Sequence, residues 1–270
     1  MVEIKKNIMY NAHMSTHKYE ITDNEWNRIK DMFPPEHPKS GKRGRPAKYD
    51  NRSIMNGILW IVRTGAQWRE LPERYGKWQA VYARYRQWDQ KKLFAFIFAQ
   101  LTADADMENL SIDSTSCKVH QSSNGGKKRE EKAIGRSKGG LNTKIHAIVD
   151  GIGNPLAFLL SPGNDHDSKH AIPLLDKVFI KSSNILGDKA YGAKAIRDYI
   201  ISKEAKYTIP PKSNDLTPWE VDYFTYKERH LIECFFQKLK WFRRIFSRYD
   251  KLDSSFLAFV YIAAFMILLK

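Results

Sequence analysis

The order of short apolar segments after residue 110 is the feature that most constrains how this chain can fold. Leu110 and Ile112 predict a short strand that ends at Asp113, and alternate residues over 141–149 are apolar or β-branched, as in a strand with two different faces. The later elements are predicted as a turn at 153–155, a return strand over 156–160, a helix over 169–178, a strand over 185–186, a helix over 193–203, a strand over 207–209 and a helix over 223–246. A hairpin followed by alternating strands and helices predicts an α/β fold, with a mixed sheet and helices on its faces.

The segment before residue 110 predicts helices instead of strands. Thr22 caps a first helix with Glu25 in its first turn, and a pair of prolines ends it. Further helices are predicted over 51–63 and from near Lys77. Three short helices with a basic outer face predict a small all-α, helix-turn-helix-like domain. A plain helical bundle with a solvated charged face fits the same pattern, so both interpretations stay open.

The charge balance favours a polyanionic partner. Lys and Arg outnumber Asp and Glu by 45 to 30, a formal net charge of +15, and such a surface binds nucleic acid with release of counterions. A generically basic protein is the alternative. Cys117 and Cys234 form neither a metal-ligand spacing nor a disulfide framework, which fits a reducing compartment. The apolar segment 256–269 is shorter than the roughly 20 residues of a membrane span, so we expect a buried helix and no membrane partner.

Two aspartates are placed where a metal site could form. Asp113 and Asp188 each follow a predicted strand, and an acid there points out of the core. Either residue alone is most simply a cap or turn residue. Two such acids on neighbouring strands indicate a pair that binds a metal ion.

The predicted helix over 223–246 carries a narrow polar stripe. Tyr226, Arg229, Glu233 and Lys240 fall within an arc of about 60°, and the other directions between residues 229 and 242 are mostly apolar. We therefore expect a helix that is buried around most of its circumference, and a buried charged stripe must be paired or must meet a ligand. An internal ion pair between Arg229 and Glu233 explains those two residues but leaves Tyr226 and Lys240 without a role.

The spacing of these four residues resembles the glutamate signature of bacterial insertion-sequence transposases of the DDE class. The resemblance runs from about residue 15 to the end of the chain and is greatest to the insertion-sequence-five (IS-five) family. Three further runs share this context: Asp-Ser-Thr at 113–115, Gly-Arg-Ser-Lys-Gly-Gly at 135–140 and Asp-Lys-Ala-Tyr at 188–191.

The resemblance implies an RNase H-like catalytic fold whose catalytic and metal-binding residues are Asp113, Asp188 and Glu233. Two Mg²⁺ ions, for which Mn²⁺ substitutes, are the implied cofactors, because paired metals activate the nucleophile and stabilise the leaving oxygen in phosphodiester cleavage. The short interval between Asp188 and Glu233 leaves little room for the large inserted β domain of some relatives.

The resemblance also implies a domain order and a set of DNA contacts. We expect a disordered leader over 1–14, with Met14 as an alternative start, a helical DNA-binding domain over 15–105 and the catalytic domain over 106–270. A mobile basic loop is predicted over 121–140. Four residues near the acids are expected to contact DNA: Tyr226, Arg229, Lys240 and Lys189.

Two further features stand outside the triad. Lys42-Arg43-Gly44-Arg45-Pro46 resembles an AT-hook, in which Arg43 and Arg45 would lie in a narrow minor groove, but a basic linker explains it equally well. His166 lies in an Asn-Asp-His-Asp run, either near the site or as a loop residue with a structural hydrogen bond.

Three functions are consistent with these features. The first is a transposase that binds the terminal inverted repeats of an insertion sequence, cleaves its ends and joins the 3′ hydroxyl to target DNA. It would act on double-stranded DNA as a homo-oligomer in the bacterial cytoplasm, associated with the nucleoid. The second is a catalytically inactive, transposase-derived DNA-binding protein, and the third is a repair nuclease or resolvase of the same fold. The intact triad favours the first.

Overall fold

The computed structural model describes residues 19–36, 48–123 and 133–270. The leader over 1–14 and the Arg43–Arg45 motif lie outside these residues. The described part before the sheet is helical, as predicted. Its α-helices are α2 (Asp23–Ile29), α3 (Asn51–Thr64), α4 (Trp78–Gln90) and α5 (Leu93–Leu101), with 3₁₀ turns η2 (Lys30–Met32), η3 (Trp68–Glu70) and η4 (Glu73–Tyr75).

Local signals define the ends of these helices. The Thr22 hydroxyl accepts a hydrogen bond from the Glu25 backbone N–H, and the Glu25 carboxylate accepts one from the Thr22 N–H, which completes a capping box. Gly65 ends α3 with a φ of 70°, a conformation that glycine adopts at little cost. The first and second predicted helices are thereby confirmed, whereas α5 was not predicted as a separate helix.

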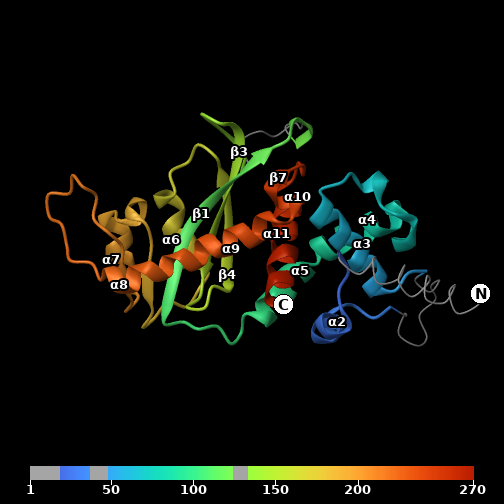
Figure 1. Cartoon of the computed structure of the whole chain (residues 1–270), viewed down its shortest axis with the longest axis horizontal. Helices are drawn as coiled ribbons and strands as arrows, with labels where there is room; N and C mark the ends of the chain where they lie inside the picture. The colour runs from blue at the N-terminus through green and yellow to red at the C-terminus, as the bar shows by residue number, and fades with distance from the viewer. Residues whose placement is uncertain (1–18, 37–47, 124–132) are drawn as a thin grey trace, which may run out of the picture.

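A mixed sheet is the centre of the part that follows residue 108 (Figure 1). Its strands are β1 (Asn109–Val119), β2 (Gly135–Ser137), β3 (Gly140–Val149), β4 (Pro155–Pro162), β5 (Asn184–Leu186), β6 (Lys206–Thr208) and β7 (Ser247–Arg248). The main path runs β2-β3-β1-β5-β6, with β4 also paired to β3 and β7 to β1. The long strand β1 is antiparallel to β3 and parallel to both β5 and β7. The mixed sheet with helices is therefore confirmed.

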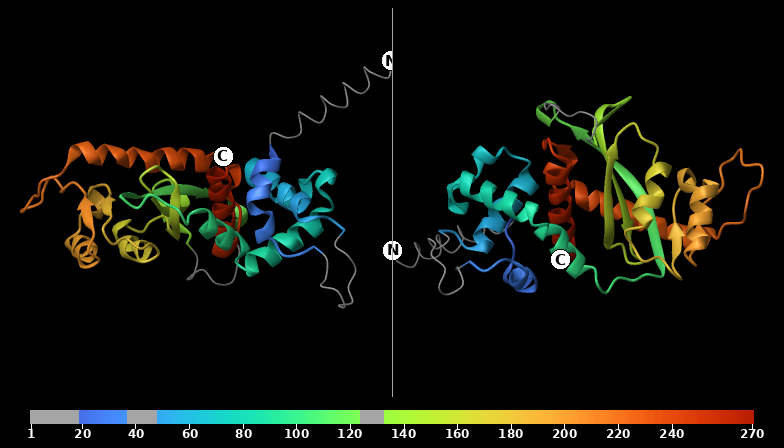
Figure 2. Two further views of the ribbon diagram at one scale, coloured as in Figure 1. Left: turned by 90° about the horizontal axis from the view of Figure 1, so that it is seen from below. Right: turned by 180° about the vertical axis from the view of Figure 1, so that it is seen from behind.

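Helices cover both faces of this sheet, as Figure 2 shows most clearly in its left view. The covering helices are α6 (Ser168–Leu175) and α7 (Lys194–Ser202) on one face and α9 (His230–Lys240) on the other. Two 3₁₀ turns also belong to this part of the chain: η5 (Gln121–Ser123) follows β1, and η6 (Lys189–Tyr191) lies between β5 and α7. Two buried apolar clusters result, one on each face, because side chains alternate across each strand.

The C-terminal helix α11 (Asp253–Leu268) joins the helical part to the sheet. It packs against α5 and α3 on one side and against α9 and β4 on the other. Phe259 and Ala263 are fully buried, and the Tyr85 ring of α4 stacks on Phe259 at a centroid distance of 4.8 Å. The expected burial of this apolar segment is confirmed. Among the described residues, no helix combines the length and the hydropathy that crossing a membrane requires.

The predicted long helix over 223–246 is wrong in two respects. The structure divides it into α8 (Tyr223–Tyr226), η7 (Lys227–Arg229), α9 and α10 (Arg243–Phe246). The helix is also not buried around most of its circumference: Cys234 is exposed and Trp241 is 75% exposed. The assumption of a constant 100° per residue fails at a 3₁₀ turn, and α9 covers the sheet with one face only.

One prediction about a strand and one about a loop also need correction. Asp113 lies within β1 and not at its end, because β1 continues to Val119 through pairing with β3 and β7. The expected basic loop over 121–140 is structured at both ends by η5 and β2, and residues 124–132 lie outside the described part.

Candidate active site

The register of two parallel strands places Asp113 beside Asp188. In the β1–β5 pairing Ser111 is the partner of Leu186, and each aspartate lies two residues further along its own chain. Asp113 Oδ1 accepts a hydrogen bond from the backbone N–H of Ser114 at 2.7 Å. Asp188 Oδ1 accepts one from Ala190 at 2.8 Å and caps η6. Backbone contacts therefore hold both carboxylates in place.

Arg229 connects Glu233 to this pair. Its Nη1 donates a hydrogen bond to Asp113 Oδ2 at 2.9 Å, and its Nη2 forms an ion pair with Glu233. The helical ion pair considered from the sequence is therefore present. Arg229 also contacts Asp113, which an ion pair within the helix does not predict. Through Arg229, Glu233 on α9 is therefore linked to Asp113 on β1.

Burial and the neighbouring charges act on the pKa values of Asp113 and Arg229. Burial raises the pKa of Asp113 above its ordinary value, and the charges of Asp188 and Asp167 act in the same direction. A backbone N–H and the Arg229 guanidinium oppose this rise. Burial alone would lower the pKa of Arg229, but Asp113 and Glu233 raise it above its ordinary value. An added cation would therefore stabilise the charged form of Asp113.

The donor chemistry of this site fits a hard divalent cation, since carboxylate oxygens are the preferred ligands. Asp113 supplies such oxygens from β1, and Asp188 supplies them from the turn that follows the adjacent strand β5. In the part of the chain that the structure describes, no group of three or more His, Cys, Asp or Glu side chains is arranged to hold a metal ion. Arg229 lies between Asp113 and Glu233, where a cation shared by those two acids would lie.

The remaining predicted residues lie at different distances from the acids. The Arg229 guanidinium carbon is 6.0 Å from the Tyr226 ring centroid, so Tyr226 is part of the same surface. Lys189 follows Asp188 directly and is exposed. Lys240 is half-buried at the end of α9, about 10 Å along the helix from Glu233 at 1.5 Å per residue.

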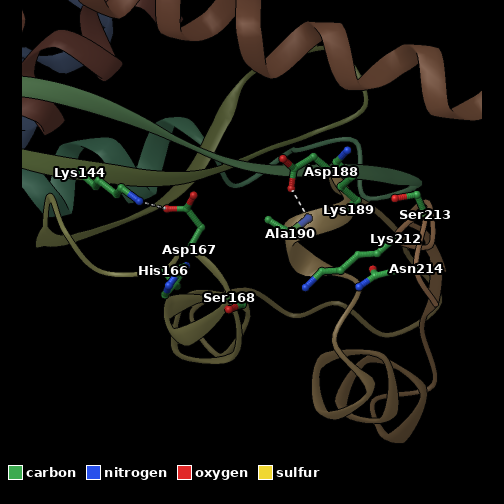
Figure 3. Close-up of a pocket in the computed structure, with 10 residues that line it drawn as sticks. All are labelled: Lys144, His166, Asp167, Ser168, Asp188, Lys189, Ala190, Lys212, Ser213 and Asn214. Atoms are coloured by element: carbon green, nitrogen blue, oxygen red, sulfur yellow. Dashed lines mark hydrogen bonds and ion pairs between the residues drawn. The ribbon is translucent and has the colours of Figure 1, made fainter. Parts of the chain in front are cut away.

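A polar network beside the acids was missed from the sequence. The Lys144 ammonium donates to Asp167 Oδ1 at 2.9 Å, and the Ser114 hydroxyl donates to the same oxygen at 2.8 Å. His166 lies beside these residues on the wall of a pocket that also includes Asp188 (Figure 3). The sequence signal for this network is the last residue of the Asn-Asp-His-Asp run, Asp167, and not the histidine before it.

The fold and the acidic site together define an RNase H-like protein of the DDE transposase class. A family model described as "Transposase DDE domain" matches residues 104–217, and one described as "Putative transposase of IS4/5 family" matches residues 21–98. The chain belongs to the insertion-sequence transposases of the IS4/5 type. Membership in this class implies a nuclease and transferase that depends on a divalent metal.

Two relatives from other bacteria resemble this chain, and the name of the first agrees with this assignment. A protein of Brucella ovis named "Putative transposase for insertion sequence element IS6501" is 39% identical over 134 residues, which are 48% of this chain and 100% of that protein. The "Uncharacterized protein y4sN" of Sinorhizobium fredii is 36% identical over 121 residues, 45% of this chain and 94% of that protein.

A solved structure shares the fold. The piggyBac transposase in a synaptic complex with hairpin DNA superposes with a TM-score of 0.52 at 11% identity, covering 92% of this chain and 70% of that one. At this identity the likeness concerns the fold alone.

Proposed function

We propose that this chain is a metal-dependent DNA transposase that cuts phosphodiester bonds at the terminal inverted repeats of its insertion sequence and joins the freed 3′ hydroxyl to target DNA. One observation supports this most directly. The β1–β5 register brings Asp113 and Asp188 together, and Arg229 links the Glu233 side chain to them. Family membership supports the reaction class, and the contacts of Arg229 with Asp113 and Glu233 support the choice of residues.

In this proposal Asp113, Asp188 and Glu233 hold two Mg²⁺ ions, with Mn²⁺ as a substitute. When bound, the ions supply an activated nucleophile and offset the charge on the leaving oxygen. Asp113 and Asp188 provide the fixed part of this site, since backbone N–H groups hold both. Glu233 is 52% exposed on its helix and completes the site from the other side when Arg229 moves away.

The cationic side chains around the acids have a complementary task. Arg229 presents two guanidinium nitrogens in a fork, and the same fork can bind a phosphate in place of two carboxylates. Lys240 and Lys189 would contact phosphates on either side, and Tyr226 would position the strand. The helical part would bind the inverted repeats as a homo-oligomer on DNA, in the bacterial cytoplasm near the nucleoid.

The second candidate function is a DNA-binding protein that has lost catalysis. The Arg229–Glu233 ion pair gives it some support, because it accounts for Glu233 without any metal. The intact set of acids favours the enzyme.

The experiment that separates these functions is Mg²⁺-dependent nicking of a duplex that carries the inverted repeat flanking the coding region. The natural chain should nick it, and Asp113→Asn and Asp188→Asn should each bind the duplex normally without nicking. Binding without nicking by the natural chain, in both Mg²⁺ and Mn²⁺, would leave only the inactive DNA-binding protein.

A further inference from the structure

A polar pocket of about 440 Å³ adjoins Asp188 on the side of the sheet that α6 covers (Figure 3). The start of α6, the turn η6 and the segment 212–214 form its walls. Ala190 is the single apolar residue of its lining. Pockets for small molecules are lined mainly by apolar and aromatic side chains, so this pocket suits a charged, hydrated ligand better.

One lysine of the pocket is held in place. The Lys144 ammonium donates to the Asp165 carbonyl at 2.7 Å and to Asp167 Oδ1 at 2.9 Å. The same Asp167 oxygen also accepts the Ser114 hydroxyl at 2.8 Å. Lys144 therefore offsets the charge of Asp167 and keeps one ammonium hydrogen for a ligand.

The other two lysines are available. Lys189 and Lys212 are exposed, and within the described ranges neither ammonium group makes a hydrogen bond or an ion pair. The pocket has two carboxylates, and Lys144 is paired with that of Asp167. The charge of Asp188, the other carboxylate, would be neutralised by a metal ion bound there. Positive charge therefore remains without a partner beside the acids, next to the neutral hydrogen-bonding side chains of Ser213 and Asn214.

We propose that this pocket binds a phosphate of a DNA strand that runs past Asp188, with Lys189 and Lys212 as its contacts and Lys144 fixed beside them by Asp167. This inference rests on the proposed function and extends it, because it assigns a binding site on the far side of Asp188 from Glu233. The strand comes either from the element end or from the target DNA. Both present the same phosphate, so experiment must distinguish them.

Lys212 is the residue to change, because its side chain is exposed and its ammonium group makes no hydrogen bond or ion pair with the residues that the structure describes. Lys212→Ala and Lys212→Glu are compared with Lys203→Glu, an exposed lysine at the end of α7 that does not line the pocket. Binding of the element-end duplex is measured with Ca²⁺ in place of Mg²⁺ across a salt series. Nicking of that duplex and transfer of a pre-cut end into a plasmid are measured separately.

If the element strand occupies the pocket, Lys212→Ala should weaken binding of the end duplex several-fold and lower its salt slope by about one unit, as expected when one phosphate interaction is removed, and Lys212→Glu should do more. Reduced binding and nicking of the end duplex identify the element strand as the occupant, whereas an effect confined to strand transfer identifies target DNA. Unchanged binding and transfer in Lys212→Glu, or an equal effect of Lys203→Glu, would overturn the inference. Failure of the natural chain to nick, with a normal salt slope, contradicts the proposed function alone.

Discussion

Asp113 and Asp188 are 75 residues apart in the chain, and each lies two residues beyond the paired Ser111 and Leu186, Asp113 within β1 and Asp188 just after the end of β5. The parallel pairing of β1 with β5 brings the two segments together up to the Ser111–Leu186 pair, and the bond from the Ala190 N–H then holds the Asp188 carboxylate. Their proximity adds to the burial that raises the pKa of Asp113. Two carboxylates kept close together at this cost are typical of a functional site.

Glu233→Gln should abolish nicking while folding and DNA binding persist. Glutamine keeps the shape of the side chain but loses the charge that would balance a metal ion, so we expect roughly a thousandfold or greater loss of rate. If Glu233 served only the ion pair with Arg229, the change would cost about 0.5 kcal/mol of stability and spare the rate. Asp198→Asn is the control, because Asp198 forms an exposed pair with Lys194 at the same spacing on α7.

His146 should make stability depend on pH. Burial lowers its pKa from 6.5 to about 4, with His170 and Lys144 acting in the same direction and Asp167 against it. As the pH falls below 6.5, His146 binds a proton in the unfolded chain, but in the folded chain it stays neutral until about pH 4. The contribution of His146 to the free energy of unfolding is therefore complete above pH 6.5 and is lost as the pH falls to 4. At 1.36 kcal/mol per pKa unit, the loss amounts to about 3 kcal/mol.

His146→Gln tests this dependence, since glutamine can still bond to the Ser161 hydroxyl, which lies 2.8 Å from His146 Nε2. Urea unfolding of both proteins from pH 7 to 4 gives the difference in free energy. That difference should shift in favour of the variant as the pH falls. A constant difference would show that His146 is not the group that titrates.

Tyr191→Phe should leave the melting temperature unchanged or raise it. The Tyr191 side chain is 1% exposed, and its hydroxyl has no hydrogen-bond partner within the described residues. A buried, unpaired polar group costs about 1–3 kcal/mol, and phenylalanine keeps the ring. Tyr85→Phe is the matched control and should lower the melting temperature, because the Tyr85 hydroxyl donates to the Ser255 carbonyl at 2.8 Å. A clear loss of stability in Tyr191→Phe would show that its hydroxyl is bonded in solution.

Arg248→Ala should be strongly destabilising. The fully buried guanidinium donates to the Thr143 hydroxyl at 2.9 Å, to the Asp250 carbonyl at 3.0 Å and to Asp253, and so ties β3 to the start of α11. Loss of one partner of a buried pair costs about 3–5 kcal/mol. Lys181→Ala, which breaks an exposed pair, should change unfolding by less than about 1 kcal/mol in the same denaturant titration. Equal effects of the two changes would contradict this role.

Changing Arg43 and Arg45 together to alanine should weaken DNA binding and lower its salt slope by up to about two units, one for each phosphate interaction that the substitutions remove. This prediction comes from the sequence motif alone, because residues 37–47 lie outside the described part. Binding isotherms across a salt series measure the slope. Superimposable isotherms for the natural chain and the variant would identify the segment as a linker.

The sequence alone determined the local elements of this protein. The Thr22 cap, the left-handed Gly65 and the alternation over β3 depend on residues a few positions apart, and backbone sterics and side-chain periodicity govern them. The length and apolarity of the C-terminal segment likewise predicted its burial. The spacing of Tyr226, Arg229, Glu233 and Lys240, which resembles a signature of the family, indicated the family from the sequence.

Only the tertiary structure decided how the candidate site is assembled. Two contacts join segments that are far apart in the chain, Arg229 with Asp113 and Lys144 with Asp167. The 3₁₀ turn before α9 interrupts a segment that its periodicity predicted as one helix. Strand register and helix position depend on the packing of whole faces against two cores, and the free energy of that packing is shared among residues far apart in the chain. The sequence could therefore propose the three acids, while the fold placed the Arg229 guanidinium in contact with both Asp113 and Glu233.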